Sequence, residues 1–383
     1  MTNPIRKIFV VAGARPNFMK IAPLMRELRR YQKSFRPVLV HTGQHYDKTM
    51  SSVFFRHLKI PRADIRLRVG SASHAVQTAR IMTSFEKALL RERPDLVVVV
   101  GDVNSTLACS LVASKLHIKI AHVEAGLRSF DPRMPEEINR KITDTLSDYL
   151  FVTEPSALKN LKKEGIDTKK GFYVGNIMID TLLMNQTQIK RSIILKNIAR
   201  KTKQNIRPRH YAVLTLHRPA NVDHPHSLNA IFSILQDICS KIPIIYPMHP
   251  RTAKMLHRFG FLKRFQSIPN LTIIDPIGYV DFIHLIRRSK LVLTDSGGIQ
   301  EETTFLKIPC ITMRDSTERP ITVTQGTNYL TGTNHAQILK TVNLILGGRA
   351  KRGSRPRFWD GRTAKRIVRI LLKAKKPKNK CKS

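Results

Sequence analysis

Short runs of aliphatic and β-branched residues recur along the chain, and a stretch with helical periodicity follows each of them. The runs are apolar at consecutive positions, which is typical of parallel strands buried between two layers of helices. In the first half the runs are KIFVVAG (7–13), PVLVHTG (37–43), DLVVVVGD (95–102), IKIAHVE (118–124) and YLFVTE (149–154). The helical stretches between them include residues 18–31, 75–91 and 107–116. This alternation predicts a doubly wound α/β architecture.

The alternation stops between residues 177 and 209, where the sequence is helical in pattern, basic and free of strand signals. It then resumes with YAVLTLH (211–217), IPIIYPMH (242–249), LTIID (271–275), KLVLTD (290–295) and PCITMR (309–314). We therefore expect two Rossmann-like domains. Ligands of such sheets bind outside the carboxyl ends of the strands. With two domains, the cleft between them is the expected active site.

Composition limits the class of protein further. The 383 residues, 42% of them hydrophobic, are enough for two buried cores. The apolar run at residues 8–14 is too short to span a bilayer. Four widely spaced cysteines show no metal-ligand spacing, which argues against a zinc site and a disulfide framework: Cys109, Cys239, Cys310 and Cys381. Reduced cysteines fit the cytoplasm.

The formal net charge of +40 is extreme and attracts anions such as nucleotides, nucleic acids or acidic membranes. Lysine and arginine are spread through every segment and are densest at residues 190–209 and 373–383. The sequence contains no zinc finger, RNP-like aromatic pattern or heptad repeat. We interpret the basic runs as solvated surface and expect no specific nucleic-acid partner.

Polar residues follow the first and third predicted strands. GARPNFMK (13–20) places Arg15 and Lys20 beside a predicted helix start, where anions bind; the alternative is a loop with two surface cations. This motif is not GxGxxG, so no dinucleotide cofactor is expected. GDVNST (101–106) places Asp102 where a strand passes into a helix. Asp102 is a candidate acid or base, and an N-cap is an equally good interpretation.

Carboxylates gather after the fourth strand, in HVEAGLRSFDPRMPEEINR (122–140). Glu124 ends the strand and has no evident structural reason to be there. Glu136 and Glu137 begin a helix, where acids favour the helix dipole. Glu137 is therefore interpreted as a helix-start acid, and Asp131 is left unassigned.

The second half offers cations and a phosphate cradle. His217 and His249 lie at the ends of two successive strands. TDSGGIQEE (294–302) runs from a strand through Ser-Gly-Gly into a helix, which lets a phosphate approach backbone amides. Glu301 or Glu302 could reach ribose hydroxyls, and a plain helix cap is the alternative interpretation. Together the two halves predict a nucleotide-linked substrate with its diphosphate on the second domain.

In this order the motifs resemble the non-hydrolysing UDP-N-acetylglucosamine 2-epimerases, from residue 8 to residue 372. The motifs are GARPNFMK, HTGQHYD, VGDVNSTLA, HVEAGLRS, MPEEINR, LHRPANVD, MHPR, TDSGGIQEE, STERP and FWDG. The resemblance implies a glycosyltransferase-B-like fold with domains at residues 1–175 and 176–358. It also implies a C-terminal helix within 359–383 that crosses back to the first domain.

The resemblance implies an isomerase that needs no redox cofactor and no metal. UDP leaves together with the C2 proton of UDP-GlcNAc, 2-acetamidoglucal forms, and UDP adds back to give UDP-ManNAc for surface polysaccharide synthesis. By motif, the catalytic positions are Asp102, Glu124, Glu136 and His217. The UDP-binding positions are Arg15, Lys20, Phe282, Ser296, Gly297, Gly298, Glu302 and Arg319. The resemblance also implies a cytoplasmic homodimer.

Two departures from the family pattern and several alternatives stay open. HRPANVD stands where many members read HRRE or HREN. Gln44 fits part of an allosteric UDP-GlcNAc site, but Asp47 stands where an amide is expected. The alternatives are an epimerase of another UDP-2-acetamido sugar, a hydrolysing epimerase, a glycosyltransferase of the same fold, and a basic nucleic-acid-binding protein that has lost catalysis.

Overall fold

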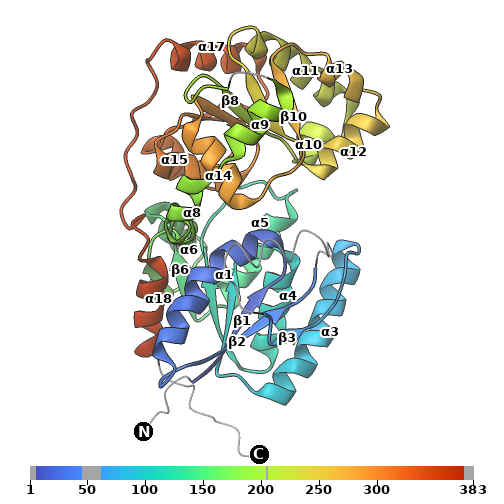
Figure 1. Cartoon of the computed structure of the whole chain (residues 1–383). Helices are drawn as coiled ribbons and strands as arrows, with labels where there is room; N and C mark the ends of the chain where they lie inside the picture. The colour runs from blue at the N-terminus through green and yellow to red at the C-terminus, as the bar shows by residue number, and fades with distance from the viewer. Residues whose placement is uncertain (1–5, 45–61, 204–205, 375–383) are drawn as a thin grey trace, which may run out of the picture. The chain divides into compact units, whose positions relative to one another are not determined.

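The computed structural model describes residues 6–44, 62–203 and 206–374. The chain divides into two compact units, one formed by Met1–Met184 with Arg357–Ser383 and the other by Asn185–Pro356. Each unit contains one all-parallel sheet with helices on its faces (Figure 1). The predicted doubly wound α/β class is therefore confirmed for both units.

The first sheet has the strand order β3-β2-β1-β4-β5-β6-β7. The order reverses between β1 and β4, which is the point where such sheets bind ligands. β4 is buried at all five positions, as its uninterrupted valine run predicts. The strands are β1 Lys7–Ala12, β2 Arg36–His41, β3 Ile65–Arg66, β4 Leu96–Val100, β5 Lys119–Val123, β6 Tyr149–Val152 and β7 Gly171–Tyr173.

The helices of the first unit begin where the sequence places its start signals. Proline occupies the first turn of α1, α5 and α6, where its missing N–H costs nothing. Ser73 accepts a hydrogen bond from the amide of Val76 and caps α3. The helices are α1 Arg15–Leu28, α3 His74–Glu92, α4 Asn104–Lys115, α5 Pro135–Leu146, α6 Pro155–Lys163, α7 Ile177–Met184 and α18 Thr363–Leu372, with 3-10 turns η1 Arg29–Tyr31 and η2 Thr168–Lys170.

The second sheet has the order β10-β9-β8-β11-β12-β13, so its reversal lies between β8 and β11. The strands are β8 Ala212–Thr215, β9 Ile244–Pro247, β10 Leu271–Ile274, β11 Leu291–Thr294, β12 Cys310–Thr312 and β13 Asn328–Leu330. Its helices are α8 Gln186–Arg191, α9 Ile194–Thr202, α10 Pro219–Val222, α11 Pro225–Cys239, α12 Pro250–Arg258, α13 Leu262–Gln266, α14 Tyr279–Arg288, α15 Gly297–Leu306, α16 Pro320–Thr324 and α17 His335–Leu346.

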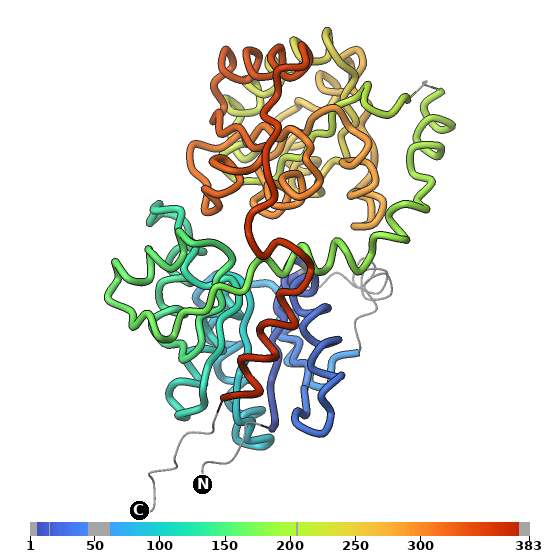
Figure 2. Tube along the Cα trace, turned by 90° about the vertical axis from the view of Figure 1, so that its left-hand side faces the viewer, coloured from blue at the N-terminus to red at the C-terminus, as the bar shows by residue number. Residues whose placement is uncertain are grey.

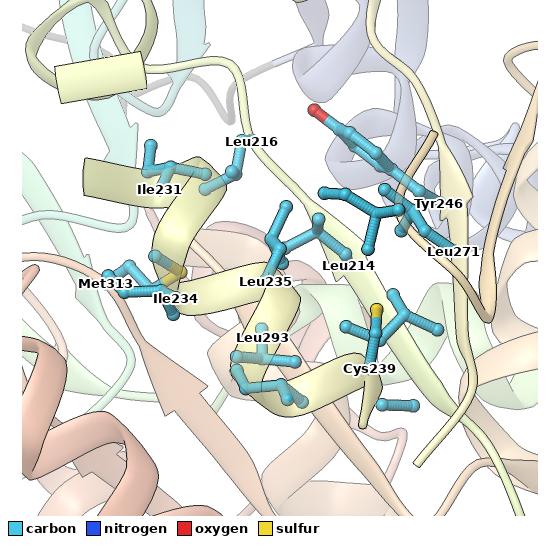
Figure 3. Packing of buried hydrophobic residues seen from close by; sticks show 14 of the residues in the cluster. Leu214, Leu216, Ile231, Ile234, Leu235, Cys239, Tyr246, Leu271, Leu293 and Met313 are labelled. Carbon is cyan, nitrogen blue, oxygen red and sulfur yellow. The ribbon is translucent and has the colours of Figure 1, made fainter. Parts of the chain in front are cut away.

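The core of the second unit forms between α11 and the central strands. Leu235 of α11 lies beside Leu214 of β8, and Tyr246 of β9 belongs to the same cluster (Figure 3). The apolar residues of α11 recur at helical spacing, so one face of the helix is buried. This packing fixes β8 and the segment after it, which carries His217.

The C-terminal segment packs on the first unit, where α18 contacts α1 and α7 (Figure 2). The amides of Thr363 and Ala364 donate to the buried Asp180 carboxylate over 3.1 and 2.8 Å. Trp359 donates its Nε1–H to the carbonyl of Thr153. Across the described ranges, no helix is both long and apolar enough to cross a membrane.

Candidate functional site

The carboxyl ends of β4 and β5 hold the acid cluster of the first unit. Glu124 follows β5 with its backbone in the left-handed region, at φ 72°. A residue with a side chain adopts this conformation at a cost, and such strain concentrates at functional sites. Its Oε2 accepts a hydrogen bond from Nζ of Lys20 over 2.5 Å, and both side chains are buried. Lys20, predicted to bind UDP, is thus paired with a predicted catalytic carboxylate.

Asp102 lies at the end of β4 and is paired with Arg140 of α5. Nη1 of Arg140 donates to Oδ2 of Asp102 over 2.5 Å, and Nη2 donates to Oε2 of Glu137 over 2.6 Å. Glu137 also accepts from the amides of Ser129 and Phe130, so it holds the loop before α5. The structural interpretation of Glu137 is therefore supported. Glu136 lies in the same first turn and is half-buried.

A buried polar network supports the loops that carry Asp102 and Glu124. His122 lies between the Asp144 carboxylate (2.7 Å) and the carbonyl of Gly101 (2.8 Å). The buried ring thereby links the Asp144 carboxylate to the backbone just after β4. Burial alone would raise the pKa of Asp144, but the charges of His122 and Arg128 outweigh it and lower that pKa. Gly101 has φ +67°, and an added Cβ would lie 2.9 Å from Nζ of Lys20.

In the second unit, His217 is held by the buried Asp295 at the end of β11. Nδ1 of His217 lies 3.0 Å from Oδ1 of Asp295. The Asp295 carboxylate also accepts from the amides of His217 and Arg218 and from the side chain of Asn221. Burial raises the pKa of Asp295, but these bonds and the His217 charge outweigh it, so the net shift is downward. The His217 side chain is 35% exposed, which leaves its ring open to a ligand.

The start of α15 forms the predicted phosphate cradle. Ser296 is the N-cap, and Gly297 and Gly298 are the first two helical residues. A Cβ at Gly297 would lie 2.8 Å from Nη1 of Arg319, so a larger residue would require the guanidinium to shift. Nε of Arg319 lies 2.7 Å from Oε1 of Glu301. The cradle therefore combines free helix N–H groups with a cation beside them.

Glu302 is buried one turn into α15. Burial raises its pKa to about 8, although interaction with Tyr279 acts in the opposite direction. Tyr279 and the half-buried Phe282 belong to α14, which contacts α15. Since Glu301 is paired with Arg319, Glu302 is the better candidate for ribose contacts.

The remaining predicted residues have mixed outcomes. Arg15 is the first residue of α1, but its side chain lies outside the described part of the structure. Gln44 is buried, and its Oε1 accepts a hydrogen bond from Oγ of Ser105 over 2.8 Å. Asp47 lies outside the described residues. The regulatory role of Gln44 stays a prediction. Among the described residues, no group of three or more His, Cys, Asp or Glu could hold a metal ion.

A family model described as UDP-N-acetylglucosamine 2-epimerase matches residues 26–372. The chain belongs to this family. It is 43% identical over 373 residues to the UDP-N-acetylglucosamine 2-epimerase of Methanocaldococcus jannaschii, covering 96% of this chain and all of the relative. It is 40% identical over 370 residues to the UDP-2,3-diacetamido-2,3-dideoxy-D-glucuronate 2-epimerase of Pseudomonas aeruginosa, covering 96% and 99% of the two chains.

Solved structures of the family agree with the fold. The crystal structure of the M. jannaschii epimerase in complex with UDP-GlcNAc and UDP matches with a TM-score of 0.88. It is 42% identical and covers 96% of this chain and all of that chain. The predicted class of two Rossmann-like domains and the membership of the epimerase family are both confirmed.

Sequence reasoning missed three residues that hold the candidate site residues or their loops in place. They are Arg140, which binds Asp102; Asp295, which binds His217; and Asp144, which binds His122 and Arg128. The sequence could have indicated Asp295, because this residue ends a buried strand directly before the Ser-Gly-Gly cradle. Arg140 and Asp144 lie inside an amphipathic helix, where charges are ordinary.

Gly297→Ala is expected to weaken UDP binding by about tenfold, because the added methyl group displaces the Arg319 guanidinium from the cradle. Alanine has the higher helix propensity, so the thermal midpoint should not fall. Isothermal titration with UDP and a thermal melt would measure the two effects. Unchanged affinity for UDP would show that Arg319 and the cradle do not bind it.

Proposed function

We propose that this protein catalyses the reversible C2 epimerisation of UDP-N-acetylglucosamine to UDP-N-acetylmannosamine. The C2 hydrogen is not acidic until the anomeric C–O bond breaks. The reaction then needs acid and base groups near C2 and positive groups on the departing diphosphate. UDP leaves as the C2 proton is lost, 2-acetamidoglucal remains, and UDP adds back with a proton on the opposite face of C2.

The observation that carries the proposal is the strand-end acid cluster of the first unit. Asp102 and Glu124 end adjacent strands, and each is paired with a cation, Arg140 or Lys20. Each pair holds its carboxylate at the end of a strand, where a base for C2 could act. A glycosyltransferase of the same fold has no need of a base for C2. We assign Asp102, Glu124 and Glu136 to proton transfer.

We assign UDP to the second unit. The α15 N-terminus with Ser296, Gly297 and Gly298 supplies N–H groups for the diphosphate, and Arg319 adds positive charge. Glu302 accepts hydrogen bonds from the ribose, and Phe282 packs beside the uracil. His217, oriented by Asp295, assists the leaving oxygen. Arg15 and Lys20 on the first unit, and the interdomain position of the site, stay predictions.

Proton NMR of the purified protein with UDP-GlcNAc in D2O tests the reaction. We expect signals of UDP-ManNAc and deuterium at C2 of both sugars. Asp102→Asn should remove both changes and leave UDP binding intact. UDP binding without exchange or a new sugar would contradict the proposal.

The P. aeruginosa relative supports a second substrate, a UDP-2,3-diacetamido uronic acid. The same NMR experiment with that sugar distinguishes the two. Faster exchange at C2 of the uronic acid than of UDP-GlcNAc would assign it as the preferred substrate and leave the chemistry unchanged.

UDP affinity should rise with pH between about 7 and 8. The Glu302 carboxyl has its pKa raised to about 8 in the free protein, and its ionised form is the stronger acceptor for the ribose hydroxyls. Affinity should therefore increase by up to about tenfold per pH unit below 8 and then level off. Calorimetric titrations with UDP in buffers of different ionisation enthalpy should show that UDP binding releases a proton. Glu302→Gln should abolish the release, and a pH-independent wild type would refute this role of Glu302.

We further propose that the enzyme works as a cytoplasmic homodimer. The free, buried thiols of Cys109, Cys239 and Cys310 fit a reducing compartment. Light scattering coupled to size-exclusion chromatography would determine the number of copies.

A further inference from the structure

Exposed cations gather at the amino edge of the first sheet, where its strands start. This edge is opposite to the one that carries Asp102 and Glu124. In a parallel sheet each crossing helix ends where the next strand begins, so the ends of α1, α3, α4 and α6 all lie here. We name the basic pole by its exposed residues Arg26, Arg29, Arg30, Lys33, Arg91, Arg93, Lys115, Lys162, Lys163, Arg369 and Lys373.

The last two of these residues lie at the end of the C-terminal helix α18, Arg369 in its last turn and Lys373 as its C-cap. The start of α18 is fixed at the carboxyl edge of the sheet, where Arg366 donates to the carbonyl of Val174 just after β7. From there α18 runs beside α1 to the amino edge (Figures 1 and 2). Five of the nine residues that follow Ala374 are lysine, so the cationic sequence continues from this point.

The carboxylates at the same edge are fewer than the exposed cations of the pole, so the edge keeps an excess of positive charge. Glu27 pairs with Arg30 and Glu92 with Arg91, and these two arginines belong to the pole. Glu92 also pairs with Lys7 and Glu164 with Arg128, while Asp95 accepts from the amides of Arg6 and Lys7 and Asp148 from the amide of Ile120. One or two cations per helix end would offset the helix dipole. Three exposed cations after Leu28 exceed that need.

Two large apolar side chains are exposed among these cations. Leu90 in the last turn of α3 is 57% exposed, and Leu372 at the end of α18 is 36% exposed. Basic residues mixed with isolated apolar ones are typical of surfaces that lie on anionic lipid headgroups. A surface for single-stranded nucleic acid would instead present aromatic side chains for stacking.

We propose that the basic pole binds the enzyme reversibly to an anionic lipid surface. The cations contact lipid phosphates, and Leu90 and Leu372 enter the headgroup region. The edge with the acid cluster then faces away from the membrane, so binding leaves the substrate side open. This function would account for the exposed cations of the pole, which lie on the opposite edge from the acid cluster.

Co-sedimentation with vesicles tests the proposal on the full chain. We expect binding to phosphatidylcholine vesicles with about one third phosphatidylglycerol, and release between about 0.1 and about 0.5 M NaCl. The triple variant R29E/K33E/R369E should bind at least about a hundredfold more weakly. The matched triple variant K241E/K254E/K263E changes exposed lysines of the second unit by the same charge, and it should bind far better than the pole variant.

Two further measurements identify the partner. L90S/L372S should lower vesicle binding by about threefold to tenfold and leave binding to polyuridine RNA unchanged. R29E/K33E/R369E and L90S/L372S should both keep C2 exchange in solution, and this activity would show that both variants fold. Equal binding to neutral and anionic vesicles, or equal losses in the two triple variants, would overturn the proposal. Tighter binding of the wild type to polyuridine than to vesicles would also overturn it.

Discussion

Lys20→Met is expected to lower the free energy of unfolding by about 3–5 kcal/mol, because the buried Glu124 carboxylate would lose its ammonium partner. The two side chains are only 9% and 2% exposed, and the atoms lie 2.5 Å apart. Glu124→Gln should also lower the free energy of unfolding, because the buried Lys20 ammonium would lose its carboxylate partner. The double variant K20M/E124Q should recover most of the lost stability, since it buries no charge at this position.

Activity should respond differently from stability. All three variants should lose C2 exchange by at least about a hundredfold, because the double variant restores packing but not the carboxylate. Urea unfolding and NMR exchange would measure the two properties separately. Arg30→Met is the matched control: it removes the Glu27 pair, in which the arginine is 62% exposed, and should cost under about 1 kcal/mol. If the double variant lost as much stability as the two single variants together, Lys20 and Glu124 would not stabilise each other.

The sequence predicted the central strands of both sheets because these strands are apolar on both faces, and it missed the short strands β3, β7 and β13 at the sheet edges. The five valine-rich and isoleucine-rich runs of the first half became parallel strands at the expected positions, and the strandless segment after residue 177 became helices α7, α8 and α9. The same strand predictions placed the polar candidate residues at the carboxyl ends of the strands, where ligands of such sheets bind. The domain boundaries and the roles of the individual residues stay predictions.

The ion pairs could not be predicted in the same way. Lys20 and Glu124 are 104 residues apart, and Arg140 is 38 residues from Asp102. Their contact depends on the register of β4 against β5 and on the angle at which α5 leaves the sheet. The left-handed backbone of Glu124 likewise has no local signal, because glycine or asparagine is the residue expected there.

Opposite charges are paired in both units before any substrate binds. Glu124 faces Lys20, Asp102 faces Arg140, and in the second unit Glu301 faces Arg319. This pairing gives a structural reason for the few carboxylates that a strongly basic chain keeps at these positions. In each pair the two charges offset each other, and the contact holds both side chains in place.

Asp295→Asn is expected to lower kcat for C2 exchange by about 10²–10⁴-fold and to change KM much less. Asp295 accepts from Nδ1 of His217 and from the His217 and Arg218 amides, so it fixes both the ring and the segment after β8. An amide cannot hold the same tautomer and charge. Single-turnover and steady-state kinetics would separate the chemical step from binding.

The pH dependence of stability provides the second readout for Asp295. Its pKa is lowered in the folded state, so the ionised carboxylate stabilises the protein above the unfolded value of about 4, and this contribution is lost as the pH falls through the folded pKa. The Asn variant should therefore be less stable at pH 7 and should lose less stability on acidification. Asp223→Asn, which removes an acid from the same segment where it pairs with the half-exposed Arg251, is the control and should keep kcat. A wild-type kcat in the Asp295 variant would mean that His217 acts without this carboxylate.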